Sequence, residues 1–297
     1  MADMREVLRQ EFELQQAAPE LRSVIRHYLD RPAGFLRSRL LLETARIYRN
    51  NDGSADVAGT ADQESARWQL AAGLELLHLF ALMHDDWLDR GPAAHRPPAD
   101  AAPALLLLGG DLLHTLGMRR IRRTVEEHRL DHRIMDIVED AAVTTINGQV
   151  AEMHFTVPPA DGAAAKEALF RLYDKKTGVY TCVAPLQVGA LCSGSTTARQ
   201  DLPILRELGL MLGRAFQLGD DLEDIPRLEL NGETPWEYNL LRVLQVVDRD
   251  SPTSLEQARQ WREQLLDAAL KTAGTTSHPE AMGSLVSNCI PLKEVTT

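Results

Sequence analysis

The segment Leu74–Asp89 reads LELLHLFALMHDDWLD. Leucine, histidine and alanine side chains recur along it at spacings of three and four, which is the period of a helix with one buried face. That face runs directly into Asp85 and Asp89. A second stretch, Ala215–Asp224, reads AFQLGDDLED and has the same arrangement. We therefore expect two helices that each end in a cluster of carboxylates.

Clustered carboxylates at the end of a core-facing stripe need a cation. Side chains four residues apart on a helix share a face, so each DDxxD pattern gathers its acids instead of scattering them. Unpaired charges are costly to bury, and neighbouring carboxylates repel one another. Oxygen ligands without a nearby Cys or His cluster suit Mg²⁺, which commonly adds substrate phosphates and waters. The alternative is that each acidic helix end simply faces solvent, which explains one copy of the pattern better than it explains two.

Composition excludes several other classes of protein. The chain has 297 residues, with 32 Lys and Arg against 43 Asp and Glu, for a formal charge of -11. This charge argues against nonspecific nucleic-acid binding, which depends on many cationic contacts to phosphates. The three cysteines have no CxxC spacing, so neither a disulfide framework nor a zinc site is expected. We find no signal peptide and no apolar run long enough to span a membrane, and we expect a cytoplasmic protein.

The rest of the chain also has helical periodicity, and no segment has the alternation of a strand. We expect a single all-α domain over residues 1–297, with a less regular tail after about residue 274. The expected helices cover residues 3–28, 35–50, 62–90, 102–126, 130–155, 163–193, 198–225, 236–248 and 253–273.

Three further signatures occur between the two acidic stretches. They are Gly110-Asp111, Gly148-Gln149 and Lys176-Thr177-Gly178. With these in the same order, the chain resembles the trans-isoprenyl diphosphate synthases, also called the polyprenyl synthetase family. The resemblance covers about residues 20 to 245. It implies an isoprenoid synthase-like helical bundle around a central cavity, with the acidic motifs facing each other at its mouth, and it implies a homodimer.

The resemblance also implies a reaction. An allylic diphosphate would ionise with the help of about three Mg²⁺ ions, and the double bond of isopentenyl diphosphate would capture the allylic cation. The product would be a short trans-prenyl diphosphate of about C10 to C20. The implied metal ligands are Asp85, Asp86, Asp89, Asp220, Asp221 and Asp224, which with Lys176 form the catalytic set. The implied substrate-binding residues are Arg37, His78, Arg96, Gln149, Thr177 and Gln217.

The half of the site that would bind isopentenyl diphosphate departs from the family pattern. The segment Pro32–Arg39 aligns with the family's GKxxR motif in two registers. One register puts Gly34 at the lysine and keeps Arg37. The other puts Phe35 at the lysine and Ser38 at the arginine, so the lysine is absent either way.

Two alternative functions therefore remain open. The first is an enzyme of the same fold that cyclises an allylic diphosphate or transfers it to a different acceptor, and the second is a noncatalytic partner subunit. Phe80, five positions before Asp85, is interpreted as the floor of a chain-length pocket that favours a short product. The alternative for Phe80 is ordinary core packing.

Overall fold

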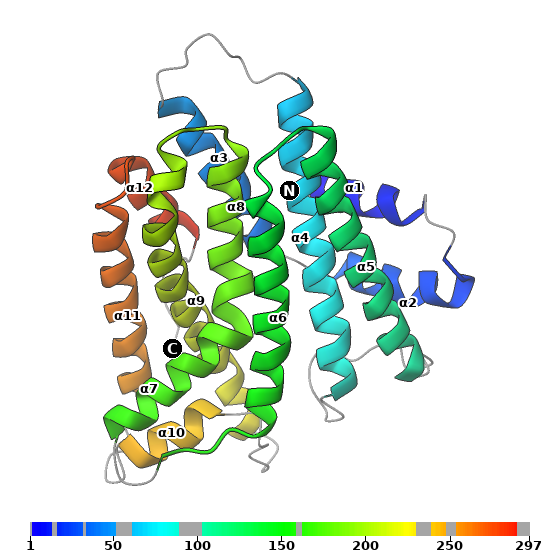
Figure 1. The fold of residues 1–297 in the computed structure, drawn as a ribbon. Helices are drawn as coiled ribbons and strands as arrows, with labels where there is room; N and C mark the ends of the chain where they lie inside the picture. Colours follow the sequence, from blue (N-terminus) through cyan, green and yellow to red (C-terminus); the bar gives the residue numbers. More distant parts are fainter. Residues whose placement is uncertain are drawn as a thin grey trace. The chain divides into compact units, whose positions relative to one another are not determined.

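A computed structural model of the chain describes residues 2–13, 17–31, 34–51, 61–88, 103–158, 162–229, 239–247 and 254–289. Helices cover most of these residues and no strand occurs among them, which confirms the all-α prediction (Figure 1). Within this described part, no helix combines the length and the hydropathy that a membrane crossing needs.

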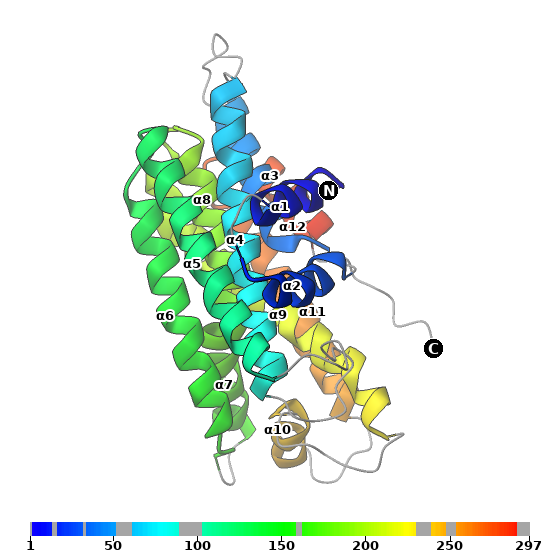
Figure 2. The ribbon, with the colours of Figure 1, turned by 90° about the vertical axis from the view of Figure 1, so that its right-hand side faces the viewer.

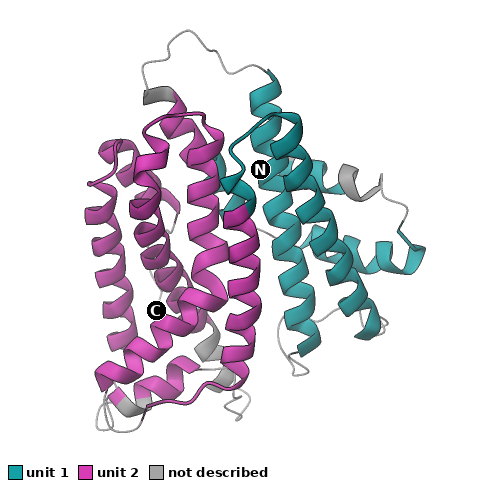
Figure 3. Cartoon of the chain, in the orientation of Figure 1, with its two compact units in different colours: residues 1–42, 55–135 teal, residues 43–54, 136–297 magenta. Residues whose placement is uncertain are grey.

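The chain divides into two compact units, which Figure 3 draws in different colours. Unit 1 comprises residues 1–42 and 55–135, and unit 2 comprises residues 43–54 and 136–297. The sequence prediction of a single domain over residues 1–297 stays a prediction.

Unit 1 is built on a pair of long helices. It holds α1 (Ala2–Glu13), α2 (Pro19–Asp30), α4 (Ala61–Leu88), α5 (Pro103–Glu127) and the start of α3 (Leu36–Asn51). Figure 1 and Figure 2 both show α4 and α5 side by side, and the two helices contact each other extensively. The middle of α4 is buried, with Leu70, Leu76 and Met83 almost without exposure. Within the predicted stripe Leu74 is 5% exposed, whereas Leu77, His78 and Ala81 are only half-buried, so the most buried face of α4 is offset from the stripe that leads to Asp85.

The first expected helix, over residues 3–28, is wrong, because the chain has two helices there. α2 begins at Pro19, and Ala18 before it has the extended dihedrals φ -55° and ψ 142°. A proline lacks the backbone N–H of a continuing helix and its ring crowds the preceding turn, so it begins a helix more readily than it continues one. Residues 14–16 lie outside the described residues.

Unit 2 contains the remaining helices. They are α6 (Arg133–Met153), whose first residues belong to unit 1, and then α7 (Gly162–Tyr173), η1 (Asp174–Val183), α8 (Ala184–Cys192), α9 (Ala198–Glu229), α10 (Asn239–Val247), α11 (Ser254–Ala273) and α12 (Pro279–Cys289). α9 packs against η1, α8 and α11. The sequence predicts one helix over residues 163–193, and the chain is helical through this range. The difference is η1, a ten-residue π-helix, whose turn is wider than that of an α-helix.

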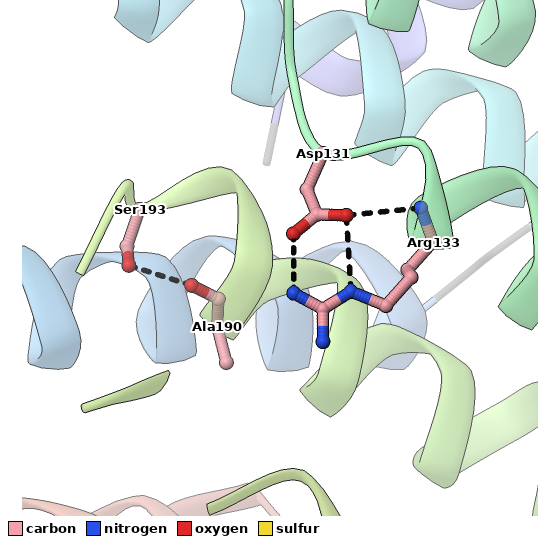
Figure 4. Close-up of polar contacts among 4 residues, drawn as sticks. All are labelled: Asp131, Arg133, Ala190 and Ser193. Carbon is pink, nitrogen blue, oxygen red and sulfur yellow. Dashed lines mark hydrogen bonds and ion pairs between the residues drawn. The ribbon is translucent and has the colours of Figure 1, made fainter. Parts of the chain in front are cut away.

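Polar side chains mark two helix ends (Figure 4). At the start of α6, Asp131 Oδ1 accepts a hydrogen bond of 3.1 Å from the backbone N–H of Arg133, and its carboxylate also binds the Arg133 guanidinium. After α8, the hydroxyl of Ser193 donates to the carbonyl of Ala190 over 2.6 Å. Both contacts satisfy backbone groups that have no partner inside their helix.

A buried aspartate holds the C-terminal part of unit 2. Asp201 lies in the first turn of α9 and is 4% exposed. Its carboxylate accepts a hydrogen bond from the hydroxyl of Tyr48 at 2.6 Å and from the backbone N–H of Ser277 at 2.7 Å. The chain then forms α12, which buries Met282 and Val286. The region after residue 274 is thus more regular than the sequence predicts.

Candidate active site

The first acidic motif lies at the end of α4, in unit 1. Asp85 and Asp86 are in its last turn and are half-buried. Asp89 and Arg96, a predicted metal ligand and a predicted substrate-binding residue, lie outside the described residues.

Asp86 is held by two side chains from the end of α2 and the residue after it. The hydroxyl of Tyr28 donates to Asp86 Oδ2 over 2.6 Å, and Arg31 Nη2 donates to the same oxygen over 3.0 Å. The Arg31 guanidinium also lies 3.9 Å from the centre of the Tyr28 ring. Burial and the adjacent Asp86 carboxylate raise the pKa of Tyr28, so this hydroxyl stays a donor at neutral pH. One oxygen of Asp86 is therefore already bound by two donors.

The second acidic motif lies on α9, in unit 2. Asp220 is exposed, whereas Asp221 turns inward and is half-buried. The hydroxyl of Tyr173 donates to Asp221 Oδ2, and Gln217 Nε2 donates to Asp221 Oδ1 over 2.8 Å. Burial raises the pKa of the Asp221 carboxyl to about 6, although these hydrogen bonds oppose the shift. The side chain of Asp224 lies outside the described residues.

Three of the residues predicted from the sequence form one hydrogen-bonded row beside this motif. Thr177, on η1, donates through its hydroxyl to Gln217 Oε1 over 2.6 Å. Gln217 in turn donates to Asp221, so the row connects η1 with the acidic end of α9. The sequence places Thr177 and Gln217 forty residues apart, and the fold brings their side chains into contact.

Lys176 is the fourth predicted residue in this region. Its Nζ lies 2.5 Å from Glu152 Oε2, and Glu152, near the C-terminal end of α6, is 8% exposed. The positive charge of Lys176 also acts to lower the pKa of Asp221. Gln149, another predicted residue, lies half-buried on α6 three residues before Glu152. Glu152 and Tyr173 lie outside every signature in the sequence, so no local pattern predicts their place in the site.

Glycines allow the π-helix to lie close to its neighbours. A Cβ atom on Gly148 of α6 would lie 2.5 Å from the backbone nitrogen of Lys176. A Cβ atom on Gly213 of α9 would overlap the Cα of Gly178. No residue larger than glycine fits at either position without moving η1. The glycines of the predicted signatures therefore set the position of the backbone that carries Lys176 and Thr177.

The predicted acceptor-side residues Arg37 and His78 lie together in unit 1, beside an unexpected acid. Arg37 is 5% exposed and Glu75 is 3% exposed, and the positive charge of Arg37 acts to lower the pKa of Glu75. The Glu75 carboxylate accepts hydrogen bonds from the backbone N–H of Ser38 at 3.0 Å and from its hydroxyl at 2.8 Å. Burial raises the pKa of Glu75, whereas burial and Arg37 hold the pKa of His78 well below its usual range. His78 is therefore neutral at physiological pH.

The backbone just before this cluster is also unusual. Phe35 is 8% exposed and has a φ of 48°, in the left-handed region that a bulky residue seldom adopts. Gly34 beside it is exposed. The position aligned with the family's lysine is therefore an exposed glycine, Gly34, in one register and a buried aromatic residue, Phe35, in the other.

Phe80, the predicted floor of a chain-length pocket, packs against two imidazole rings. Its ring centre lies 4.7 Å from that of His84 and 5.0 Å from that of His114, both in edge-to-face geometry. His84 Nε2 is also 3.5 Å from Asp111 Oδ1, in the Gly110-Asp111 signature. Burial lowers the pKa of His114, which favours its neutral ring. Phe80 therefore belongs to a cluster of rings on α4 and α5, and its role in chain length stays a prediction.

The donor set at both acidic motifs fits Mg²⁺. The side chains offered are carboxylates, and a nearby divalent cation would favour the ionised form of Asp221, which burial disfavours. Among the side chains that the structure describes, no three Asp, Glu, His or Cys groups already form a metal-binding cluster. Mg²⁺ typically takes one or two carboxylates and completes its six ligands with phosphates and waters.

Comparisons with known proteins agree with these features. A sequence model of the polyprenyl synthetase family matches residues 18–229. The geranylfarnesyl diphosphate synthase of Aeropyrum pernix is 28% identical over 175 residues, which are 57% of this chain and 53% of that protein. The farnesyl diphosphate synthase of Escherichia coli is 30% identical over 164 residues, which are 52% of this chain and 53% of that protein. The chain thus spans about half the length of these curated relatives.

The fold has close counterparts among solved structures. A decaprenyl diphosphate synthase from Rhodobacter capsulatus superimposes with a TM-score of 0.69, at 21% sequence identity, over 97% of this chain and 94% of that one. The matched segment of the family model includes both acidic motifs and the three signatures between them. This chain is therefore a member of the polyprenyl synthetase family.

Proposed function

We propose that this chain is a Mg²⁺-dependent trans-prenyltransferase that joins an allylic diphosphate to isopentenyl diphosphate and gives a prenyl diphosphate of about C10 to C20. Membership of the family supports this proposal. The observation that carries it is the hydrogen-bonded row of Thr177, Gln217 and Asp221, because it connects the Lys-Thr signature directly to the second acidic motif.

The metal would be held by carboxylates of both acidic motifs, which are Asp85, Asp86, Asp89, Asp220, Asp221 and Asp224. About three Mg²⁺ ions would neutralise the diphosphate and stabilise the charge that develops as it leaves. Asp86 differs from the others, because Tyr28 and Arg31 bind one of its oxygens. This pairing orients the Asp86 side chain and leaves its other oxygen to act as a ligand.

The reaction needs the carbon–oxygen bond of the allylic diphosphate to break, with both electrons leaving on the diphosphate. The double bond of isopentenyl diphosphate then bonds to the allylic carbon, and one proton is lost to form the new double bond. Lys176 would favour the negative charge on the departing diphosphate, and Glu152 holds its ammonium group in place. The oxygens of Thr177 and Gln149 would stabilise the adjacent cation.

Product length would be limited by the ring cluster around Phe80. Its side chain is five residues, about one and a half helical turns, before Asp85. A chain that grows from the metals along α4 would therefore meet an aromatic ring after a short distance. The contacts with His84 and His114 keep this ring in place.

A second candidate function is supported by the cluster around Arg37. Binding the diphosphate of isopentenyl diphosphate needs accessible cations, yet Arg37 is 5% exposed with Glu75 in its field, and His78 favours its neutral form. The buried Phe35, at one of the two positions aligned with the family's lysine, supplies no positive charge. These observations favour an enzyme that ionises an allylic diphosphate and then cyclises it or transfers it to an uncharged acceptor.

One experiment distinguishes the two candidates. The purified chain is incubated with Mg²⁺ and geranyl or farnesyl diphosphate, with and without isopentenyl diphosphate, and the products are identified by mass spectrometry. An elongated prenyl diphosphate that requires isopentenyl diphosphate supports the first candidate. A cyclised product, or diphosphate release from the allylic substrate alone, supports the second. No consumption of any allylic diphosphate would contradict both and favour a noncatalytic subunit.

We also propose that the chain forms a homodimer through α6. Val143, Ile146, Val150 and Met153 are 60%, 51%, 51% and 49% exposed and recur at spacings of three and four. Such spacing places them on one face of the helix. A row of exposed apolar side chains of this kind is typical of a surface that a partner covers, and a second copy supplies the same apolar row.

A further inference from the structure

A cation lies beside the second acidic motif on the side opposite the hydrogen-bonded row. Arg262, on α11, donates through its Nε to the backbone carbonyl of Ala215 over 3.2 Å. Ala215 is five residues before Asp220 on α9. Arg262 also lies beyond residue 229, where the match to the family model ends. None of the sequence signatures therefore points to it.

The backbone of α9 makes room for this guanidinium. A Cβ atom on Gly219 would lie 3.2 Å from Arg262 Nε and 3.7 Å from both Cζ and Nη2. The Arg262 guanidinium thus lies against α9 beside both the Ala215 carbonyl and Gly219, the residue immediately before Asp220. The missing side chain at Gly219 lets the guanidinium lie close to the helix.

The charges around Arg262 are almost all negative. Glu223 has the largest favourable effect on its positive charge, followed by Asp220 and then Glu263 on α11. Burial acts in the opposite direction and lowers the pKa of Arg262, which still remains protonated at physiological pH. Glu223 follows Gly219 by four residues and shares its helix face. Tyr173 and Gln217 contact Asp221, which lies on another face of α9.

We infer that Arg262 couples the binding of Mg²⁺ to the binding of diphosphate at the second acidic motif. This inference rests on the proposed function, because it assumes that Asp220 takes part in binding the metal. A fixed positive charge beside carboxylates repels a divalent cation and attracts a diphosphate. Arg262 therefore weakens the binding of Mg²⁺ alone and strengthens the binding of diphosphate once Mg²⁺ is present. The metal then binds mainly together with the substrate.

Arg262 is a positioning residue in this account, because it acts on the charge of the site. The test is calorimetry on the full chain with Mg²⁺ alone, and with inorganic diphosphate at saturating Mg²⁺. For Arg262→Gln we expect Mg²⁺ alone to bind about threefold to tenfold more tightly, and diphosphate to bind more weakly by a similar factor. Arg262→Lys keeps the charge and should restore most of both affinities.

A matched control removes the same charge from the same helix. Arg259, one turn earlier on α11, has its guanidinium 3.5 Å from Glu256 and is 41% exposed. Arg259→Gln should leave both affinities within about twofold of the unchanged chain. If Arg262→Gln fails to fold, Arg262→Met serves as a second variant, because it removes the same charge and keeps the length of the apolar part of the side chain.

The outcomes separate this inference from the proposed function. If the unchanged chain binds Mg²⁺ and diphosphate but Arg262→Gln and Arg262→Met both behave like Arg259→Gln, the inference is wrong and the proposed function stands. If the unchanged chain binds no diphosphate even with Mg²⁺, the proposed function is wrong and the inference is overturned with it. Opposite shifts in the two affinities for Arg262→Gln would support the inference.

Discussion

At the scale of single residues, burial of the Asp221 carboxylate lowers the stability of the folded chain, whereas the proposed role of Asp221 as a metal ligand needs that carboxylate to be ionised. Burial raises the pKa of its carboxyl to about 6, so the ionised form is disfavoured in the folded, metal-free chain. The ordinary value for this group is 3.8. The folded state therefore loses stability relative to the unfolded state as the pH rises from about 4 to about 6. Above that window the cost is fully present unless a cation offsets it.

Asp221→Asn is expected to remove this cost. We expect its free energy of unfolding in chelator at pH 8 to exceed that of the unchanged chain by about 1–2 kcal/mol. The difference should largely disappear at pH 4, where Asp221 is protonated in the folded state and only about half ionised in the unfolded state. Denaturant unfolding at the two pH values measures this, with Asp220→Asn as the exposed control. A variant that is less stable at pH 8 than the unchanged chain would contradict the pKa assignment.

Asp201 is expected to be the opposite case, an acid needed for stability alone. Its carboxylate is bound by Tyr48 and by both the N–H and the hydroxyl of Ser277. Asp201→Ala leaves these buried donors without an acceptor, so we expect a loss of about 2–4 kcal/mol in the free energy of unfolding. Ser277→Ala keeps the backbone contact and should cost about 1 kcal/mol. Equal losses would contradict this assignment of the contacts.

At the scale of elements, the π-helix η1 positions Lys176 and Thr177. Gly148 of α6 lies directly against the η1 backbone. Gly148→Ala is expected to displace η1 and to lower activity at least about tenfold, since small displacements of catalytic groups have large effects. Gly283→Ala on α12 is the control, because its Cβ would meet no atom within 4 Å. The control should gain about 0.5–1 kcal/mol of stability and keep full activity.

The measurement for this pair of variants is the turnover rate of the allylic diphosphate together with the thermal midpoint. A Gly148→Ala variant with normal turnover would show that the backbone position of η1 does not control the reaction.

Local patterns in the sequence predict some features of these elements and miss others. The helix that runs through Leu74 to Asp85 agrees with prediction, since periodicity carries that information, whereas the contact of Thr177 with Gln217 is not predicted by the sequence. Tyr28 approaches Asp86 across 58 residues, and Glu152 approaches Lys176 across 24. Such contacts depend on how helices pack, which a single sequence does not encode locally. The sequence also does not predict the π-helix η1, because the helix-forming pattern of residues continues through it without a break.

At the scale of the whole molecule, the apolar row on α6 should determine the oligomeric state. Ile146→Asp places a charge at the middle of this row, so we expect a dimer to dissociate to the monomer, as measured by light scattering after gel filtration. Leu270→Asp is the control, because Leu270 is 40% exposed on α11 and lies outside the row. A dimer that survives Ile146→Asp would show that its interface is elsewhere.

The proposed function depends on the carboxylates of both acidic motifs acting together on one Mg²⁺-bound diphosphate. Its most direct test is the release of diphosphate from geranyl diphosphate in the presence of Mg²⁺ and isopentenyl diphosphate, by the unchanged chain and by Asp85→Ala and Asp220→Ala. We expect release by the unchanged chain, none without Mg²⁺, and a loss of at least about a hundredfold in each variant. Release that persists without Mg²⁺, or that survives in either variant, would contradict the claim.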